Sequence, residues 1–453
     1  MEKDTTIGMQ KITGLFDSGS FVEIGAYLKR EGDLTGAICG YGAINGKLTY
    51  AFVQDSDRQK GAFDSLQAKK IGMLYEMAMK NGAPVIGFFD SIGAYVGDGS
   101  AAMAAYGALL SLVGKASGVI PQIAVIDGVC SGMAATAAAM FDLIVTVEDS
   151  AKLFVNAPFL IGKDVGTAAF AGENGLASIN AKSADEAVVK VRSLVDLLPS
   201  NCEDGVAMEE ITDDVNRLVA VEGISGVKLA ETVADAGIFT EIGGAYAKET
   251  VTGLLRIGGV CCGLVASDSA VNGGVITGDG AKKAARMVSF CDSFGIPVVT
   301  LIDSEGVAVS AAEEGSPLAA QLGKLAMAYA TAETAKITVV VGKAYGAAFT
   351  LLGSRSLGAD LVYALPEASV SVMKPEAAVA FLWNSKITET TSREALVEEW
   401  KKTCAAPEAA AADGSIDDVI PAAELRARIC SAVYMLMMKR SDASARRHCN
   451  LPL

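Results

Sequence analysis

Residues 66–89 pass from a helical hydrophobic pattern to a strand-like one. Ile71, Leu74 and Ala78 recur at the spacing of one helix face, and an uninterrupted apolar run follows over residues 85–89. A continuous apolar run after an amphipathic helix is typical of a parallel strand that is buried on both faces. The pattern therefore predicts an α/β fold in which helices alternate with buried parallel strands.

The same succession returns in the second half of the chain. Ala284, Val288 and Cys291 share one face of a predicted helix over residues 281–294, and an apolar run follows over residues 298–302. In both halves a glycine and then a proline stand between helix and strand, and these residues end helices. In both halves the strand stops at an Asp-Ser pair.

Further matches between the halves keep a nearly constant offset. They are Asp55 and Asp268, Lys69-Lys70 and Lys282-Lys283, Pro84 and Pro297, Asp90-Ser91 and Asp303-Ser304, Gly128 and Gly342, and Gly132 and Gly346. Self-similarity of this kind is the sequence signature of an internal repeat. We predict a tandem duplication of one α/β module, with domains at residues 1–225 and 226–453.

The segments outside the repeat predict simpler features. Ser183 and Glu186 have the spacing of a capping box, which predicts the start of a helix. The acidic stretch 203–214 is expected to be a solvated surface. The alanine-rich stretch 405–412 is expected to be a loop, and residues 422–438 are expected to form a C-terminal helix.

Composition narrows the class of protein. Of 453 residues, 51% are hydrophobic and 20% are charged, which indicates a well-packed globular protein. The net charge of −15 argues against a nucleic-acid partner, because phosphate binding needs a basic surface. The nine cysteines show no C-x-x-C spacing, so we expect reduced thiols in a cytoplasmic protein without a metal site. The apolar stretch 99–114 is shorter than a membrane span.

The usual catalytic side chains are scarce. The one histidine, His448, stands near the C-terminus, and no G-x-S-x-G, H-E-x-x-H or G-x-x-x-x-G-K-[ST] motif occurs. Instead, two strands run into turns of small residues, at 128–134 and 342–348. Such turns at helix N-termini present unpaired N–H groups, and two convergent groups form an oxyanion hole. Tight packing of a helix on a strand would explain the same glycines equally well.

Short motifs follow one another in order from near the N-terminus to the last residue. They are FDSGSFVE (16–23), DSIGA (90–94), GVCSG (128–132), LLPSN (197–201), AAR (284–286), FCDSFGIP (290–297), KAYG (343–346), GSIDDVI (414–420) and RHCNLPL (447–453). Together they resemble the biotin-dependent acyl-CoA carboxyltransferase family. That family includes the β subunits of propionyl-CoA and acetyl-CoA carboxylases and the α subunits of methylmalonyl-CoA and glutaconyl-CoA decarboxylases.

The resemblance implies a fold and an assembly. Each module should be a crotonase-like (ClpP/crotonase) β-β-α superhelix, in a dimer-based and often hexameric homo-oligomer. The acyl-CoA, propionyl/methylmalonyl-CoA or acetyl/malonyl-CoA, should bind the N-terminal module, and biotin on a separate carrier protein should bind the C-terminal module. A biotin carboxylase or a sodium-pumping membrane decarboxylase subunit is the implied further partner. The chain is then cytoplasmic or peripheral to a membrane complex.

The resemblance also implies site residues. Two oxyanions develop during carboxyl transfer between biotin and a thioester, and the duplicated turn supplies a backbone oxyanion hole for each. The implied residues are Gly132 and Met133, with Gly93 and Ala94, for the thioester, and Gly346 and Ala347, with Tyr345 and Ala348, for biotin. No catalytic histidine is needed, because the ureido nitrogen of biotin would act as the base.

This chain departs from the family pattern where paired glycines are usual. Met133 and Ala347 each follow a single glycine, although an amide donor survives any substitution except proline. The proline-glycine loop of the family is replaced by residues 303–308 in this chain. Glu305 lies there at the end of a strand, where ligands often bind in α/β sheets. Glu305 could influence substrate choice or simply be solvated.

Three hypotheses about function follow. The first is a working carboxyltransferase subunit whose biotin carrier is another chain, since Ala78-Met79-Lys80 lacks the second methionine of a biotin-attachment motif. The second is a catalytically degenerate assembly subunit, suggested by the altered glycine pairs. The third is a crotonase-type hydratase or isomerase, against which the duplication counts.

Overall fold

The computed structural model describes residues 6–30, 33–162 and 164–439, so His448 and Cys449 lie outside the described residues. The chain divides into two compact units, Met1–Gly205 and Val206–Leu453. This division falls earlier than the boundary at residue 225 expected from the sequence. The reason is that the connecting segment packs on the second unit, where Glu209 N–H donates to the Gly259 carbonyl at 2.9 Å and Val219 is buried.

The first unit is built on a mixed, mainly parallel sheet. Its strand order is β1 (Val22–Ile24), β4 (Ala37–Ile44), β5 (Lys47–Gln54), β6 (Val85–Ser91), β7 (Gln122–Ser131), β8 (Leu143–Val147) and β10 (Ile179–Ala181), and β9 (Lys152–Phe154) pairs with β7. β1, β4 and β5 are antiparallel, and the pairs from β5 to β10 are parallel. β2 (Lys29–Arg30) and β3 (Asp33–Leu34) form a separate two-stranded sheet.

The second unit repeats this topology. Its order is β11 (Phe239–Glu241), β12 (Thr250–Ile257), β13 (Val260–Ser267), β14 (Val298–Ser304), β15 (Lys336–Tyr345), β16 (Leu361–Ala364) and β18 (Asp418–Val419), and β17 (Ser369–Ser371) pairs with β15. Even the irregularity recurs, because the register shifts between Phe89 and Ser91 in one sheet and between Ile302 and Ser304 in the other. This agreement is what a duplicated module predicts.

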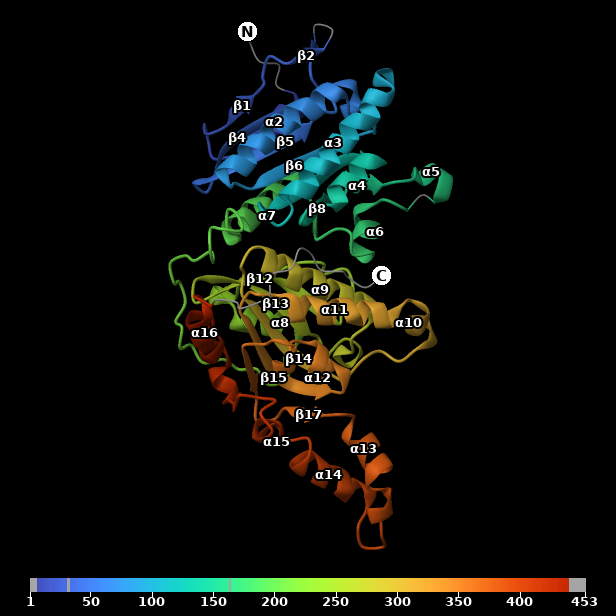
Figure 1. Cartoon of the computed structure of the whole chain (residues 1–453), viewed down its shortest axis with the longest axis vertical. Helices are drawn as coiled ribbons and strands as arrows, with labels where there is room; N and C mark the ends of the chain where they lie inside the picture. The colour runs from blue at the N-terminus through green and yellow to red at the C-terminus, as the bar shows by residue number, and fades with distance from the viewer. Residues whose placement is uncertain (1–5, 31–32, 163, 440–453) are drawn as a thin grey trace. The chain divides into compact units, whose positions relative to one another are not determined.

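Helices cover both faces of the first sheet. α2 (Ser65–Asn81) and α3 (Ser100–Ala116) lie together over one face with α4 (Met133–Ala139), and α1 (Ile7–Leu15) and α7 (Ala184–Leu197) pack on the sheet as well (Figure 1). Because side chains alternate along a strand, Phe89 points to the α2–α3 side and Phe88 to the α1–α7 side. The last two helices of this unit are α5 (Pro158–Ile161) and α6 (Ala168–Glu173).

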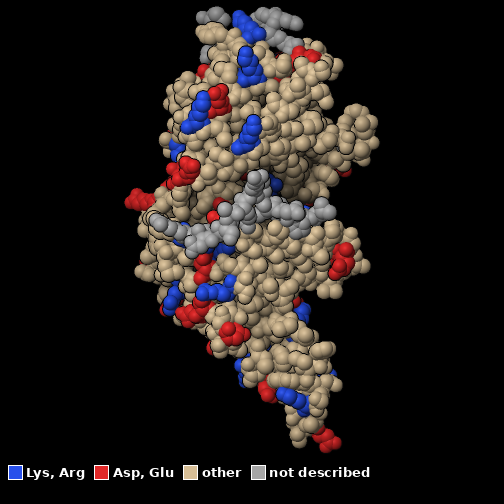
Figure 2. Space-filling model, viewed as in Figure 1, with Lys and Arg blue, Asp and Glu red and all other residues tan. Residues whose placement is uncertain are grey.

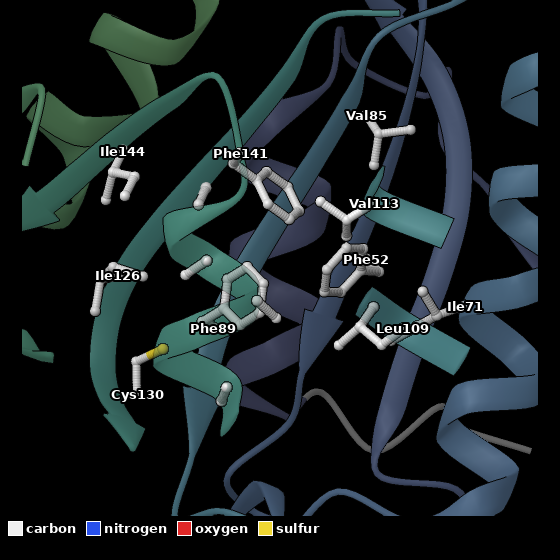
Figure 3. Close-up of a cluster of buried hydrophobic side chains, with 14 of the residues drawn as sticks. Phe52, Ile71, Val85, Phe89, Leu109, Val113, Ile126, Cys130, Phe141 and Ile144 are labelled. Carbon is white, nitrogen blue, oxygen red and sulfur yellow. The ribbon is translucent and has the colours of Figure 1, made fainter. Parts of the chain in front are cut away.

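The core between the first sheet and α2–α3 is aromatic at its centre. The Phe52 and Phe89 ring centroids are 5.5 Å apart, and those of Phe89 and Phe141 are 5.4 Å apart, both edge to face. Figure 3 shows these rings beside Leu109 and Val113 of α3. Edge-to-face pairs stabilise a core beyond simple area burial.

The second unit has equivalent helices and an extension. α9 (Gly278–Ser293), α11 (Leu318–Thr331) and α12 (Ala347–Leu351) match α2, α3 and α4, while α8 (Gly226–Val233) and α16 (Leu425–Leu436) belong to a separate core cluster. The remaining helices are α10 (Ala311–Gly315), α13 (Pro375–Leu382), α14 (Arg393–Thr403) and α15 (Pro407–Ala412). α13 and α14 project from the body of this unit with a small core of their own (Figure 1).

Short 3-10 turns complete the described elements. They are η1 (Gln59–Gly61), η2 (Val96–Asp98), η3 (Asp235–Gly237), η4 (Asn272–Gly274), η5 (Arg355–Leu357), η6 (Asn384–Lys386) and η7 (Ala422–Glu424).

One prediction about the connecting segments is confirmed and one is wrong. Ser183 caps α7 by accepting the Glu186 N–H at 3.2 Å, and the Glu186 carboxylate accepts the Lys182 N–H at 2.9 Å. The alanine-rich stretch expected to be a loop instead forms α15, because Pro407 stands in its first turn and alanine favours helix. The C-terminal helix follows η7 and begins at Leu425.

Within the described ranges, no helix is long and apolar enough to cross a membrane. α3, which contains most of the apolar stretch 99–114, buries a face that includes Tyr106, Leu109 and Val113. The described cysteines are free thiols. Lys and Arg side chains are interspersed with Asp and Glu on the face of the molecule in Figure 2.

Candidate active site

The first unit holds a pocket of about 440 Å³ beside the C-terminal ends of β6 and β7. Four residues predicted from the sequence line it together, namely Gly93, Ala94, Gly132 and Met133. The rest of the lining is largely apolar and includes Ile92, Met103, Val129, Val155 and Ala157. The C-terminal edge of parallel strands is where α/β sheets commonly bind ligands.

Gly132 shapes the turn at this pocket and does not supply a free donor. Its backbone has φ 60° and ψ −124°, which favours glycine, and its N–H donates to the Phe154 carbonyl at 2.9 Å. The prediction of the Gly132 amide as a donor is therefore wrong. α4 begins at Met133, and the Met133 N–H has no partner among the described residues.

Ala94 presents the second unpaired amide. Phe63 N–H donates to the Gly93 carbonyl at 2.7 Å, and Tyr95 N–H donates to the Phe63 carbonyl at 2.8 Å. This parallel bridge turns the Ala94 N–H away from Phe63, and no acceptor pairs with it in the described part of the chain. The Gly93 N–H, by contrast, donates to Ser91 Oγ at 3.2 Å. Ala94 and Met133 thus place two free donors on one pocket, as an oxyanion hole requires.

A partly buried carboxylate holds the end of β7 in place. Asp90 Oδ1 accepts the Val129 N–H at 3.1 Å, and a Cβ atom on Gly128 would lie only 2.2 Å from that oxygen. The strand continues through Gly128 to Ser131, so the expected turn is confined to Gly132. Gly128 is therefore needed for the close approach of Asp90.

The second unit repeats each of these contacts. Gly346 has φ 55° and ψ −129°, and its N–H donates to the Ser371 carbonyl at 2.9 Å. The Lys343 N–H donates to Asp303 Oδ1 at 2.8 Å, and a Cβ atom on Gly342 would lie 2.3 Å from that oxygen. α12 begins at Ala347, whose N–H lacks a partner within the described ranges. As in the first unit, the residue after the glycine carries the free donor.

The matching second donor is Val307, which is not among the residues predicted from the sequence. Ile276 N–H donates to the Gly306 carbonyl, and Ala308 N–H donates to the Ile276 carbonyl, both at 2.9 Å. The Val307 N–H consequently faces away from this bridge, and the described chain offers it no acceptor. The constant offset of the repeat pointed to Val307, because it is the counterpart of Ala94.

The two remaining predicted residues have different surroundings. Tyr345 is mostly buried, and its hydroxyl donates to Ser369 Oγ at 3.3 Å, so this side chain joins β15 to β17. Ala348 is fully buried in the first turn of α12. Its amide has no partner among the residues that the structure describes, but the residue has no exposed surface.

The two sites differ in the charge of the side chains around them. In the first pocket burial raises the pKa of Tyr106 to about 12, so this phenol stays neutral. Beside the second set of donors, Glu305 is bound by Lys343 at 2.7 Å and Lys374 at 2.5 Å, and these contacts lower the pKa of Glu305 to about 2. Among the described residues, no group of three or more His, Cys, Asp or Glu is placed to hold a metal ion.

Comparison with known proteins decides the family. The model of the carboxyl transferase domain matches residues 2–451. The chain belongs to the carboxyl transferase family. The resemblance found in the ordered motifs is thereby confirmed, and the chain is a carboxyltransferase.

Relatives of this carboxyltransferase cover nearly its whole length. It is 34% identical to the propionyl-CoA carboxylase beta chain of Cereibacter sphaeroides, over 98% of this chain and 93% of that one. It is 32% identical to the alpha subunit of methylmalonyl-CoA decarboxylase from Veillonella parvula, over 98% and 92%. The solved structure of transcarboxylase 12S with methylmalonyl-coenzyme A bound matches with a TM-score of 0.92 and 31% identity, over 98% and 92%.

Proposed function

We propose that this carboxyltransferase moves a carboxyl group between an acyl-CoA and biotin that is carried by a separate protein. The observation that carries the proposal is the pair of matched amide sites, Ala94 with Met133 and Val307 with Ala347. Carboxyl transfer places negative charge in turn on a thioester oxygen and on a biotin oxygen. Two sets of preorganised N–H donors fit this chemistry, because such donors lower a reaction barrier most where negative charge develops in the transition state.

The first pocket suits the thioester. Loss of a carboxyl group from a dicarboxylic acyl-CoA leaves an enolate, whose oxygen would accept hydrogen bonds from the Ala94 and Met133 amides. Ile92, Val129 and Val155 provide an apolar wall for a short acyl chain. A volume of about 440 Å³ is within the ordinary range for small-molecule sites. We therefore propose methylmalonyl-CoA or malonyl-CoA, or the corresponding propionyl-CoA or acetyl-CoA, as the substrate.

The second set of donors suits biotin as the other substrate. Val307 and Ala347 would hold charge on the ureido oxygen, while the ureido nitrogen supplies the atom that takes up the carboxyl group. Lys80 is an unsuitable attachment point, because it lies on α2 in an ion pair with Glu76 at 2.7 Å. The carrier is then another chain, working with a biotin carboxylase or a membrane decarboxylase subunit in the cytoplasm or at a membrane.

We also propose that both units are crotonase-like modules, with the acyl-CoA on the first and biotin on the second. The repeated sheet order supports the shared fold class. Assembly into a homo-oligomer is supported by α5, where Phe159 is 85% and Leu160 is 71% exposed. Exposed apolar clusters of this kind mark interaction sites. The related transcarboxylase 12S was described as a hexamer assembly.

The test is biotin-dependent decarboxylation. Purified protein is incubated with methylmalonyl-CoA or malonyl-CoA, with and without free biotin, and the acyl-CoA products are separated by chromatography. We expect propionyl-CoA or acetyl-CoA to form faster with biotin. The absence of any biotin-dependent loss of the carboxyl group, with every dicarboxylic acyl-CoA tried, would contradict the proposal. Unpaired donors in both units favour this function over a catalytically inactive assembly role.

A further inference from the structure

Three charged side chains meet beside the second set of amide donors. Glu305 directly precedes Gly306 and Val307, and its carboxylate lies 2.7 Å from Lys343 Nζ and 2.5 Å from Lys374 Nζ. Lys343 comes from β15, and Lys374 follows β17. The sequence alone left Glu305 either a determinant of substrate choice or a solvated side chain, and the two ion pairs show that it is engaged.

The first unit has an apolar residue at each of the three equivalent positions. Glu305 corresponds to Ile92, because the Glu305 N–H donates to the Gly273 carbonyl as the Ile92 N–H donates to the Lys60 carbonyl. Lys343 corresponds to Val129, because the Lys343 N–H donates to Asp303 near the end of β14 as the Val129 N–H donates to Asp90 near the end of β6.

Lys374 completes the correspondence. It follows Ser371 at the same interval at which Ala157 follows Phe154, and the Ser371 and Phe154 carbonyls accept from Gly346 and Gly132. Ile92, Val129 and Ala157 all line the first pocket. The second unit therefore keeps the backbone donors. The rim beside these donors, which consists of Glu305, Lys343 and Lys374, has two cations and one anion where the first unit has three apolar side chains.

The hydrogen bonds between these three side chains affect the charge that they carry. The hydrogen bonds from Lys343 and Lys374 hold the pKa of Glu305 near 2, and Glu305 raises the pKa of Lys343. Glu305 and Lys343 are thus charged at neutral pH, and the two lysines and one glutamate together carry a formal charge of plus one. The side chains are also partly solvated, with Lys343 and Lys374 about half exposed, so a ligand can reach both ammonium groups.

We propose that Glu305, Lys343 and Lys374 form the specificity-determining element of the second site, and that it receives the carboxylate borne on the ureido nitrogen of biotin. The inference rests on the proposed function. Glu305 keeps the two ammonium groups together before binding, and the incoming carboxylate then accepts hydrogen bonds from them in its place. Charge-assisted hydrogen bonds of this type are stronger than neutral ones. The three equivalent positions of the first unit carry the apolar residues Ile92, Val129 and Ala157, so the two sites favour different substrates although their donors match.

The test measures binding rather than turnover. Full-length protein is titrated in a calorimeter with biotin methyl ester that carries a carboxymethyl group on the ureido nitrogen, and with its uncharged N-ethyl analogue. The ester removes the carboxylate of the biotin side chain, so the two ligands differ only in the anion of interest. Because the lysines are half exposed, we expect the wild-type protein to prefer the anionic analogue by about three- to ten-fold.

Variants assign the preference to the rim. Lys343→Met and Lys374→Met should each reduce it to less than about two-fold, and Glu305→Gln should increase it because the rim gains positive charge. Lys80→Met is the matched control, since it removes an ion pair of similar length on α2 and should leave the preference unchanged. Thermal unfolding of each variant verifies that it is folded.

The outcomes separate this inference from the proposed function. Equal binding of both analogues by the wild-type protein, or a preference that survives in both lysine variants, overturns the inference alone. Failure of both analogues to bind overturns the inference and also the assignment of biotin to this unit. A preference lost in the lysine variants and retained in Lys80→Met supports the inference.

Discussion

At the scale of single residues, Gly132 and Gly346 each have a paired N–H, and the N–H of the residue that follows has no partner in the described part of the chain. Gly132 and Gly346 have positive φ, and each gives its own N–H to a carbonyl of the protein. This conformation starts a helix at the next residue, whose N–H has no helical partner because it belongs to the first turn. The side chains of Met133 and Ala347 are therefore secondary to their amides.

Proline offers a test of a single amide, because it lacks the N–H and is tolerated at the first position of a helix. We expect Met133→Pro to lower turnover of the acyl-CoA by about 10²- to 10³-fold, the usual effect of removing one oxyanion donor. Steady-state kinetics measures the loss, and circular dichroism verifies the fold. Met133→Ala keeps the donor and should retain turnover within about ten-fold. Equal activity of the proline and alanine variants would contradict the role of this amide.

At the scale of elements, a buried arginine of α16 forms ion pairs with two aspartates elsewhere in the second unit. Arg426 has no exposed surface and pairs with Asp235 and, at 3.4 Å, with Asp213. Asp235 in turn accepts the N–H groups of Gly258 and Gly259 at 2.9 and 2.7 Å in the turn between β12 and β13. One side chain thus links a C-terminal helix to the antiparallel edge of the sheet.

Removal of one partner from a buried ion pair leaves the other charge without compensation. We expect Arg426→Met to reduce the free energy of unfolding of the second unit by about 3–5 kcal/mol. Urea denaturation monitored by circular dichroism measures the change. Arg428→Met, on the same helix, removes a partly exposed contact with Glu424 at 3.1 Å and should change stability by less than about 1 kcal/mol. Similar losses in both variants would refute the special role of Arg426.

The sequence predicted those elements whose determinants are local. The buried strands β6 and β14, the helices before them and the Ser183 cap all follow from periodicity and capping residues close in the chain. The helix α15 stands where the sequence predicts a loop, because an alanine-rich composition fits both a low-complexity loop and a helix.

The missed parts of the candidate site depend on distant contacts. The Val307 amide is freed only by a bridge to Ile276, and the Gly132 amide is occupied only because β9 brings Phe154 beside it. Lys374 reaches Glu305 through the pairing of β17 with β15. None of these contacts has a local sequence pattern, although the internal repeat would have supplied Val307 from Ala94.

At the scale of the whole molecule, the two units share donors and differ in their surroundings. The first unit also carries the exposed apolar helix α5, in which Phe159, Leu160 and Ile161 are mainly solvent-exposed. Such a cluster is unfavourable in an isolated chain and is expected to be covered by another copy.

We expect the double variant Phe159→Ser and Leu160→Ser to shift the protein to a smaller assembly. The reason is that serine removes most of the apolar area that association would bury. Light scattering after size-exclusion chromatography measures the mass of each species. Tyr27→Ser is the control, because Tyr27 is equally exposed but lies outside α5. An unchanged mass for the double variant would exclude α5 as an interface.

The peptide N–H groups of four residues have no partner among the described residues, namely Ala94, Met133, Val307 and Ala347, and this affects how such chains can evolve. A codon change at these positions, unless it introduces proline, alters the shape of the site while its polar groups persist. We therefore expect that descendants of one gene can change their substrate while every intermediate protein keeps its backbone donors. Comparison of backbone geometry should accordingly group these enzymes by chemistry, whereas residue identity at the same positions should group them by substrate.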